Sequence, residues 1–214
     1  MIFKRKSVRS FTDEKVSTDK IKNLIRAGMQ APSAFNSQPW EFIVVSDKKD
    51  LKAVSKMSRY ARPAENAQKL IIVLGNTERD NVVMPMIQQD LSACTQNILL
   101  QAVAEGLGAV WLGFYPIEDR VNALRDYFNI PDHVIPFSVI AIGYPKEDKE
   151  PESRYDESKI HFMHRNLNNF LKIFKYSSIF NNNVIILFDI ESKFLLIKRT
   201  ISIYCKNNLE FFYF

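Results

Sequence analysis

The sequence predicts an α+β fold, in which one domain of about five helices and four strands occupies residues 1–162. Three observations lead to this prediction. A segment near the start has apolar residues at helical spacing, several short apolar and β-branched runs end at turn residues, and neither a repeat nor a linker precedes residue 162. The 214 residues, 46% of them hydrophobic and 25% charged, suffice for one core of ordinary size.

The first helix is expected at residues 17–30, where apolar side chains recur three and four positions apart and share one face. Ser17 or Thr18 stands where a helix N-cap belongs, because either hydroxyl can accept from a free amide of the first turn. Pro32 follows and stops the helix, since the residue before a proline disfavours helical backbone.

Two later segments are expected to lie in the interior of the domain. Residues 69–76 are a continuous apolar run ended by Gly75, which is typical of a strand buried on both faces. Residues 86–108 predict a long helix that is apolar or small on most sides, and therefore a central helix or a dimer contact, with Gly106 and Gly108 at its C-terminus. The remaining elements, in chain order, are a strand at 41–46, a polar helix at 47–57, a strand at 109–115, a helix at 117–129 and a strand containing Pro136 at 134–145.

The net charge of +5 is unevenly distributed along the chain. Residues 1–162 carry 22 Lys and Arg against 21 Asp and Glu, whereas residues 163–214 carry 7 against 3. This argues against a nucleic-acid partner, because no basic stripe interleaved with aromatic residues is present. No apolar run reaches membrane-spanning length, so we expect no membrane partner, and the basic start lacks the apolar region of a signal peptide.

Residues 163–214 have a different composition from the rest of the chain. They contain none of the glycines, prolines or alanines, and Phe, Ile and Asn each occur eight times. Their commonest amino acids have codons rich in A and T, so our hypothesis is a tail outside the fold, translated after a frameshift or read-through. The alternative is an authentic amphipathic or membrane-surface extension.

The sequence shows no catalytic constellation and no metal site. His133, His161 and His164 have no partner at metal-ligand spacing, and no glycine-rich phosphate loop follows a strand. Cys94 and Cys205 form no motif, which argues against a disulfide framework and favours a reducing, cytoplasmic location.

Two polar features remain. Arg5, Ser7 and Arg9 alternate, so that in an extended segment they point the same way and can hold a phosphate monoester. A solvated basic N-terminus is the alternative. The connection "APSAFNSQPWEF" at 31–42 has many neutral hydrogen-bonding groups and almost no charge, which is more than a surface turn needs.

Five motifs occur in an order and at spacings that resemble the nitroreductase family, in particular its short, single-domain branch. They are "RKSVRSF", "APSAFNSQPWEFIVV", "GLGAVWLGFYPIEDRV", "GYP" and "RYDESKIHF", and the resemblance covers residues 2–162. It implies an α+β homodimer with a central, mostly antiparallel sheet flanked by helices. It also implies an FMN molecule in each of two sites at the dimer interface.

The resemblance implies three groups of cofactor-binding residues and no catalytic side chain. The phosphate end of FMN is expected to be bound by Arg5, Lys6, Ser7, Arg9 and Arg154. The loop that the other subunit places over the flavin consists of Pro32, Ser33, Ala34, Asn36 and Gln38. The turn against the isoalloxazine consists of Pro116, Ile117, Glu118 and Asp119. Three positions depart from the family: Phe35 replaces a small polar residue, Asp119 a common glycine and Glu152 an occasional lysine.

In this family NADPH or NADH passes hydride to FMN, and an electron-poor acceptor such as a nitroaromatic or a quinone then takes the electrons in a ping-pong cycle. Phe35, Tyr60, Arg62 and Phe114 are candidates for the lining of the substrate slot. Two alternatives stay open: a protein of this fold that dehalogenates or degrades flavin, and a flavin-binding protein without enzymatic activity.

Overall fold

The structure is a computed structural model, and it describes residues 1–147 and 149–162. The chain divides into two compact units, Met1–Ser153 and Arg154–Phe214. The tail hypothesised for residues 163–214 lies outside the described residues, so the predicted boundary at residue 162 stays a prediction. All of the elements that carry the fold lie in the first unit.

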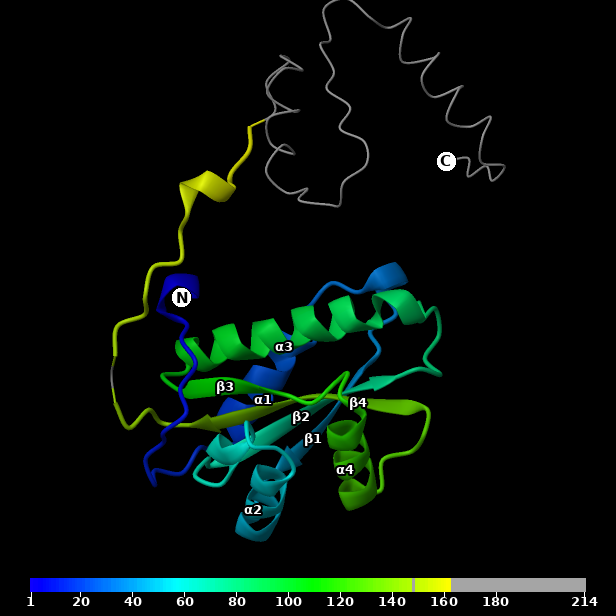
Figure 1. Cartoon of the computed structure of the whole chain (residues 1–214), viewed down its shortest axis with the longest axis horizontal. Coiled ribbons are helices and arrows are strands. Elements are labelled where there is room, and N and C mark those ends of the chain that lie inside the picture. The colour runs from blue at the N-terminus through cyan, green and yellow to red at the C-terminus, as the bar shows by residue number, and fades with distance from the viewer. Residues whose placement is uncertain (148, 163–214) are drawn as a thin grey trace, which may run out of the picture. The chain divides into compact units, whose positions relative to one another are not determined.

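The first unit is built on a four-stranded sheet whose strands run antiparallel to their neighbours, in the order β1-β2-β4-β3. The strands span Trp40–Val45 (β1), Lys69–Asn76 (β2), Gly108–Gly113 (β3) and Val134–Gly143 (β4). β2 and β4 occupy the centre (Figure 1) and are buried along almost their whole length. The predicted α+β fold with an antiparallel sheet is therefore confirmed.

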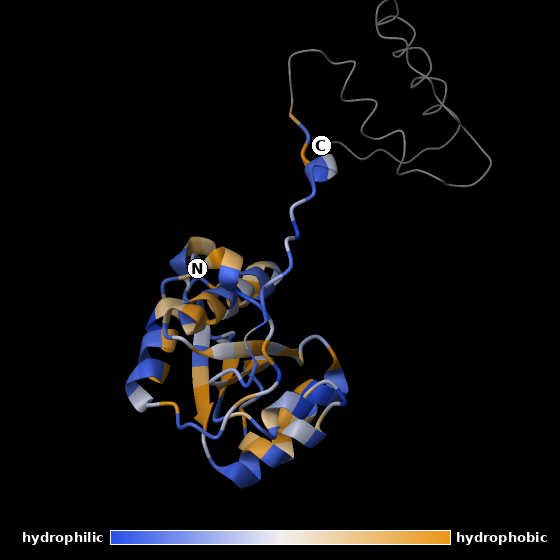
Figure 2. Cartoon of the chain, turned by 90° about the vertical axis from the view of Figure 1, so that its left-hand side faces the viewer, coloured by the Kyte–Doolittle hydropathy of each residue, from blue (hydrophilic) through white to orange (hydrophobic). Residues whose placement is uncertain are grey.

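Helices cover both faces of this sheet. They span Thr18–Gly28 (α1), Lys48–Lys56 (α2), Ile87–Ala104 (α3) and Glu118–Phe128 (α4). Ile71 and Val73 of β2 pack in one cluster with residues of α1 and α3, whereas Leu70 and Ile72 pack in a second cluster with residues of α2 and α4. The apolar stretches of the strands accordingly lie between two helical layers (Figure 2).

Local sequence explains where the first two helices begin. Ser17 Oγ accepts from the Lys20 amide at 3.3 Å, and Asp47 Oδ1 accepts from the Lys49 amide at 2.7 Å, so each helix has a side-chain N-cap. The described residues contain four α-helices, one fewer than the approximate number predicted. These residues also contain five 3-10 helices of three residues each.

Close packing joins α1 to α3. A Cβ atom built on Gly28 would lie 2.8 Å from Ile98 Cγ1, so the side chain of any other residue would push the helices apart. Cys94 is buried in the same contact, and desolvation raises the pKa of its thiol to about 12. It stays protonated near neutral pH, which removes the one described cysteine from consideration as a nucleophile.

Pro136 sits in β4 at an irregularity of the ladder. The register with β2 shifts between Val73 and Leu74, so that Phe137 is an extra residue opposite them. A bulge tolerates the missing proline N–H and turns the next carbonyl away from the ladder. The Phe137 carbonyl accepts from the Tyr115 amide at 3.0 Å, and the bulge thereby fixes the turn that follows β3.

Candidate functional site

The basic N-terminal segment lies along the outer edge of β3. Ser7 forms a parallel bridge with Ala109, and the Val8 amide donates to the Ala109 carbonyl at 3.0 Å. Val8 packs so closely on Gly108 that a Cβ there would meet Val8 Cγ1 at 2.7 Å. With Val8 turned inward, its neighbours Ser7 and Arg9 are exposed.

Alternation along this segment separates its cations. Arg9 Nη1 donates to the Ser7 carbonyl at 3.5 Å, which holds the guanidinium beside the exposed serine. Lys4 and Lys6 line, with Val8, a hollow of about 230 Å³ on the other side, where Lys6 Nζ donates to the Lys149 carbonyl. Ser7 and Arg9 are thus brought together, whereas Lys6 lies apart from them.

The loop before β1 has an unusual backbone. Phe35, Asn36 and Gln38 all have positive φ angles, of 50°, 54° and 46°. Such angles are uncommon for residues other than glycine and cost free energy that surrounding contacts must offset. The loop therefore holds a defined shape rather than that of a simple connection.

Hydrogen bonds hold this loop. The Gln38 amide donates to Ser33 Oγ at 3.0 Å, and Gln38 Nε2 donates to Asn36 Oδ1 at 2.9 Å. The Ala34 amide donates to Asp90 Oδ1 at 3.0 Å, which ties the loop to the first turn of α3. The predicted loop residues are thus brought together, and Pro32, Asn36 and Gln38 are exposed.

Asp90 was missed by the sequence reasoning. It is 6% exposed, in a helix whose other buried side chains are all apolar except Thr95. A charged residue on the buried face of an otherwise apolar helix was the available signal, because buried carboxylates need a specific partner.

The turn that joins β3 to α4 presents two free amides. The Tyr115–Pro116 peptide bond is cis, and the Ile117 amide donates to the Phe114 carbonyl at 3.0 Å. The amides of Arg120 and Val121 donate to the Ile117 carbonyl, also at 3.0 Å. Glu118 and Asp119 are the first residues of α4, and within the described part of the chain their amides have no acceptor. Helix N-terminal amides of this kind bind an electron-rich group well.

The candidates for the slot lining are only partly accessible. Phe114 is 0% exposed and packs in the core with α2 and α4, so its assignment to a slot is wrong. Phe35 is 82% exposed and Tyr60 is 56% exposed. The guanidiniums of Arg59 and Arg120 lie 4.6 and 5.4 Å from the Tyr60 ring, and Arg120 Nη1 also donates to the Gly113 carbonyl at 2.8 Å. Tyr60 is therefore close to the turn that carries the free amides.

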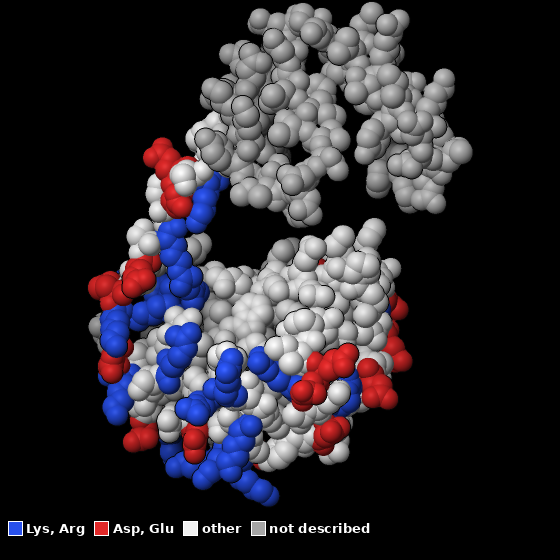
Figure 3. All heavy atoms as spheres, viewed as in Figure 1, with Lys and Arg blue, Asp and Glu red and all other residues white. Residues whose placement is uncertain are grey.

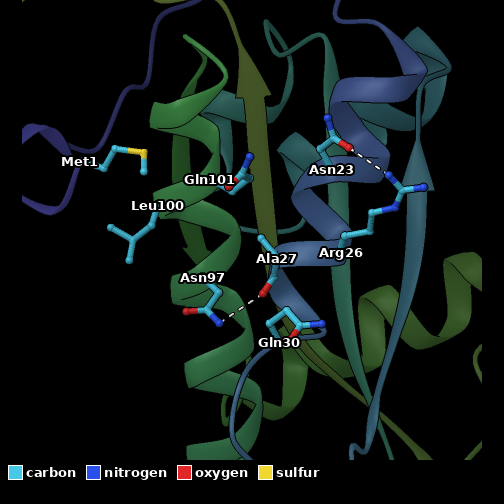
Figure 4. Close-up of a pocket in the computed structure, with 8 residues that line it drawn as sticks. All are labelled: Met1, Asn23, Arg26, Ala27, Gln30, Asn97, Leu100 and Gln101. Carbon is cyan, nitrogen blue, oxygen red and sulfur yellow. Dashed lines mark hydrogen bonds between the residues drawn. The ribbon is translucent and has the colours of Figure 1, made fainter.

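Another hollow, of about 630 Å³, lies between α1 and α3 (Figure 4). Its polar groups bond one another: Arg26 Nη1 donates to Asn23 Oδ1 at 3.3 Å, and Asn97 Nδ2 donates to the Ala27 carbonyl at 3.2 Å. It contains none of the predicted cofactor-binding residues. Because no nucleophile or base is among its lining residues, it is a poor catalytic candidate.

Charge on the surface is mixed. On the face shown in Figure 3, Lys and Arg side chains gather toward the left and lower centre and a group of Asp and Glu side chains lies at the lower right, so both signs are present. Within the described residues no helix is both long enough and apolar enough to cross a membrane. Arg154 belongs to the second unit, so its role at a phosphate stays a prediction.

Phe35 allows a test of the loop conformation. Phe35→Asn is expected to raise the free energy of unfolding by about 0.5–1 kcal/mol, because asparagine tolerates the left-handed region better and the exposed ring loses little buried area. Urea denaturation measures this change. Phe3→Asn is the control, since Phe3 is 92% exposed without a positive φ. A loss of stability specific to Phe35→Asn would mean that the ring packs against another molecule.

Known proteins are similar to this chain in sequence and in fold. The family model described as the Nitroreductase family matches residues 2–73 and 56–144. An Archaeoglobus fulgidus protein assigned as an NADH dehydrogenase/NAD(P)H nitroreductase is 42% identical over 75% of this chain and 94% of its own. A Clostridium acetobutylicum crystal structure assigned as an NADH oxidase has a TM-score of 0.74 at 42% identity, over 76% of this chain and 98% of its own.

A third relative carries a cofactor. It is a Desulfovibrio desulfuricans structure assigned as a nitroreductase in complex with FMN, with a TM-score of 0.66 at 30% identity, over 76% of this chain and 94% of its own. The extent of the family match, together with identities above 40% over nearly the whole of two relatives, shows that this chain belongs to the nitroreductase family.

Proposed function

We propose that the chain is an FMN-dependent NAD(P)H oxidoreductase that reduces electron-poor acceptors, nitroaromatics and quinones among them, as a cytoplasmic homodimer. The free amides of Glu118 and Asp119 carry the proposal, because a helix start without acceptors suits the electron-rich N5 and O4 edge of a flavin. The FMN complex of the D. desulfuricans relative supports the choice of cofactor.

The described residues fit FMN in two further respects. Ser7 and Arg9 are exposed side by side, a donor set that suits a phosphate monoester. The loop around Ala34 presents neutral groups that match the uncharged rim of an isoalloxazine, where charges would be costly to desolvate. In this assignment Arg5, Ser7, Arg9 and Arg154 anchor the phosphate, and Lys6, on the other side of the segment, is assigned to other polar atoms of the cofactor.

The redox chemistry would be supplied by bound FMN, which can take hydride from NADPH or NADH and pass it to the second substrate. The residues of the chain bind FMN, orient it and shield it from water. The amides at the start of α4 stabilise negative charge on the ring, the 33–38 loop offered by the partner subunit excludes water, and Tyr60 borders the open face. No side chain is required as acid or base. We also propose that residues 1–162 form the FMN-binding domain and that residues 163–214 are an added tail.

Spectroscopy of the purified full chain tests the function. The protein, as isolated or after adding FMN, is expected to be yellow, to bleach when NADPH or NADH is added without oxygen, and to regain colour with a quinone or a nitroaromatic. A protein that takes up no FMN would refute the proposal. Flavin that binds but is never bleached would instead indicate a flavin-binding protein without this activity.

A further inference from the structure

Two guanidinium groups lie against one exposed aromatic ring beside the turn between β3 and α4. Their central carbon atoms, Cζ of Arg59 and Cζ of Arg120, are 4.6 and 5.4 Å from the centre of the Tyr60 ring. Because these two distances add to 10.0 Å, the two carbon atoms are at most that far apart. Like charges repel each other, so contacts other than their own charges must hold the pair together.

The ring and one backbone carbonyl supply these contacts. Arg59 Nη2 donates to the Tyr60 hydroxyl, and Arg120 Nη1 donates to the Gly113 carbonyl at 2.8 Å. The negative face of an aromatic ring also attracts cations. A guanidinium has five N–H donors, so within the described residues both arginines keep donors that have no acceptor.

Core packing fixes the position of Tyr60 beside the turn. Ala61 and Ala64, which follow it, are 1% and 0% exposed and pack in one cluster with Phe114 and Leu124. Phe114 comes directly after β3, and Leu124 belongs to α4. The loop that carries the exposed ring is therefore anchored to the same core as the turn.

No carboxylate of the described residues forms an ion pair with either arginine. Glu118 and Asp119 precede Arg120 directly in α4, yet both side chains are exposed and neither is paired with it. The start of α4 adds the positive end of a helix dipole. This arrangement suits an oxyanion, which a guanidinium can bind through two parallel hydrogen bonds.

We propose that Arg59 and Arg120, held by Tyr60, form an oxyanion site that selects anionic substrates, through the extra phosphate of NADPH or a carboxylate of the acceptor. This inference rests on the proposed function, in which the amides of Glu118 and Asp119 meet the flavin and Tyr60 borders its open face. A substrate that reaches this face passes beside the two arginines. Their charge favours a negatively charged substituent without touching the atoms that react.

Arg59→Gln tests this site in the FMN-loaded full chain. Glutamine keeps a donor for the Tyr60 hydroxyl and removes the positive charge. Two pairs of substrates differ in one negative group: NADPH against NADH, and para-nitrobenzoate against neutral para-nitrobenzamide. Stopped-flow reduction and reoxidation of the flavin without oxygen give the two preferences separately.

Wild type is expected to prefer the anionic member of at least one pair. Arg59→Gln should lower that preference about tenfold, the loss of one charge-assisted hydrogen bond. High salt should lower the wild-type preference as well, because exposed charges are screened. Tyr60→Leu should also lower it, although this variant removes no charge, since both guanidiniums lose the ring that holds them.

Lys52→Gln is the matched control. Lys52 is exposed on α2, the helix that leads to Arg59, and it lines a different hollow, with Ser10 and Lys146. The variant removes one positive charge from the same region of the chain without changing the cluster around Tyr60. It is expected to keep the wild-type preference for anionic substrates.

The substrate pair that responds identifies the source of the oxyanion. A loss of preference confined to NADPH over NADH assigns the site to the phosphate of the dinucleotide, and a loss confined to the nitrobenzoate assigns it to the carboxylate of the acceptor. Equal preferences in wild type and Arg59→Gln for both pairs would overturn the inference, as would an equal loss in Lys52→Gln, which would indicate net charge alone. A wild-type chain that binds no FMN, or is not reduced by NAD(P)H, would instead refute the proposed function before any variant is compared.

Discussion

Replacing both Arg5 and Arg9 with alanine is expected to raise the Kd for FMN by roughly 10²–10⁴. Each charge-assisted hydrogen bond to a phosphate contributes about 1.5–3 kcal/mol, and every 1.4 kcal/mol changes Kd about tenfold. The fold should not suffer, because neither guanidinium forms an ion pair with a carboxylate in the described residues. Arg9 is exposed, and among the described residues its guanidinium makes a single hydrogen bond, the 3.5 Å contact with the Ser7 carbonyl.

Riboflavin makes this experiment specific for the phosphate. Wild type should bind FMN much more tightly than riboflavin, and the double variant should bind the two with nearly equal affinity. Lys4→Ala with Lys15→Ala removes the same number of charges from exposed positions and should keep the preference for FMN. A double arginine variant that still prefers FMN as strongly as wild type would place the phosphate elsewhere. Fluorescence titration of the three apoproteins with FMN and with riboflavin, at fixed salt, measures all six affinities.

Features set by local sequence were predicted well. The apolar run at 69–76 is the central strand β2, since a strand buried on both faces needs apolar side chains at every position. Ser17 caps α1 because its hydroxyl can reach an amide three residues away. Gly106 ends the region of α3 with a φ of 71°, a conformation that glycine adopts without strain.

Features set by contacts between distant segments were not predicted. The bulge at Phe137 depends on pairing with β2, and the anchor at Asp90 joins residues that are far apart in sequence. The left-handed backbone at Phe35 has no local signal, because phenylalanine does not favour that region. Phe114 was misassigned although its burial was readable: it continues the alternation of Val110 and Leu112, which pack in the same cluster.

The same contrast applies to the candidate site. The alternation in the sequence placed Arg5, Ser7 and Arg9 on one side of an extended segment, and the structure exposes Ser7 and Arg9 together because Val8 packs against Gly108. The family motif in the sequence also groups Lys6 with these residues, although the alternation of side chains turns Lys6 to the other side. Neighbours in a strand share a motif but point to opposite faces, so a contiguous motif overstates what one face presents.

Glu118→Pro is expected to slow flavin reduction by NAD(P)H about 10²–10³-fold, because removing one preorganised donor from a site where charge develops costs about that much. The substitution deletes a single N–H and disturbs little else. Glu118 is the first residue of α4, a position where proline is well tolerated. Ile117 before it has φ −82° and ψ 106°, an extended backbone that a following proline accepts.

Glu118→Ala is the matched control for Glu118→Pro, since it removes the side chain and keeps the amide. Stopped-flow reduction without oxygen should give near wild-type rates for alanine and the large loss for proline. The proline variant should also have a more negative flavin reduction potential, because the donor favours the reduced, anionic flavin. Its FMN affinity should fall much less than that of the double arginine variant, since phosphate anchoring is untouched. Equal rates in the two variants would mean that the start of α4 does not face the reactive edge of the flavin. The electrostatic role of the turn would then have to be assigned to other donors.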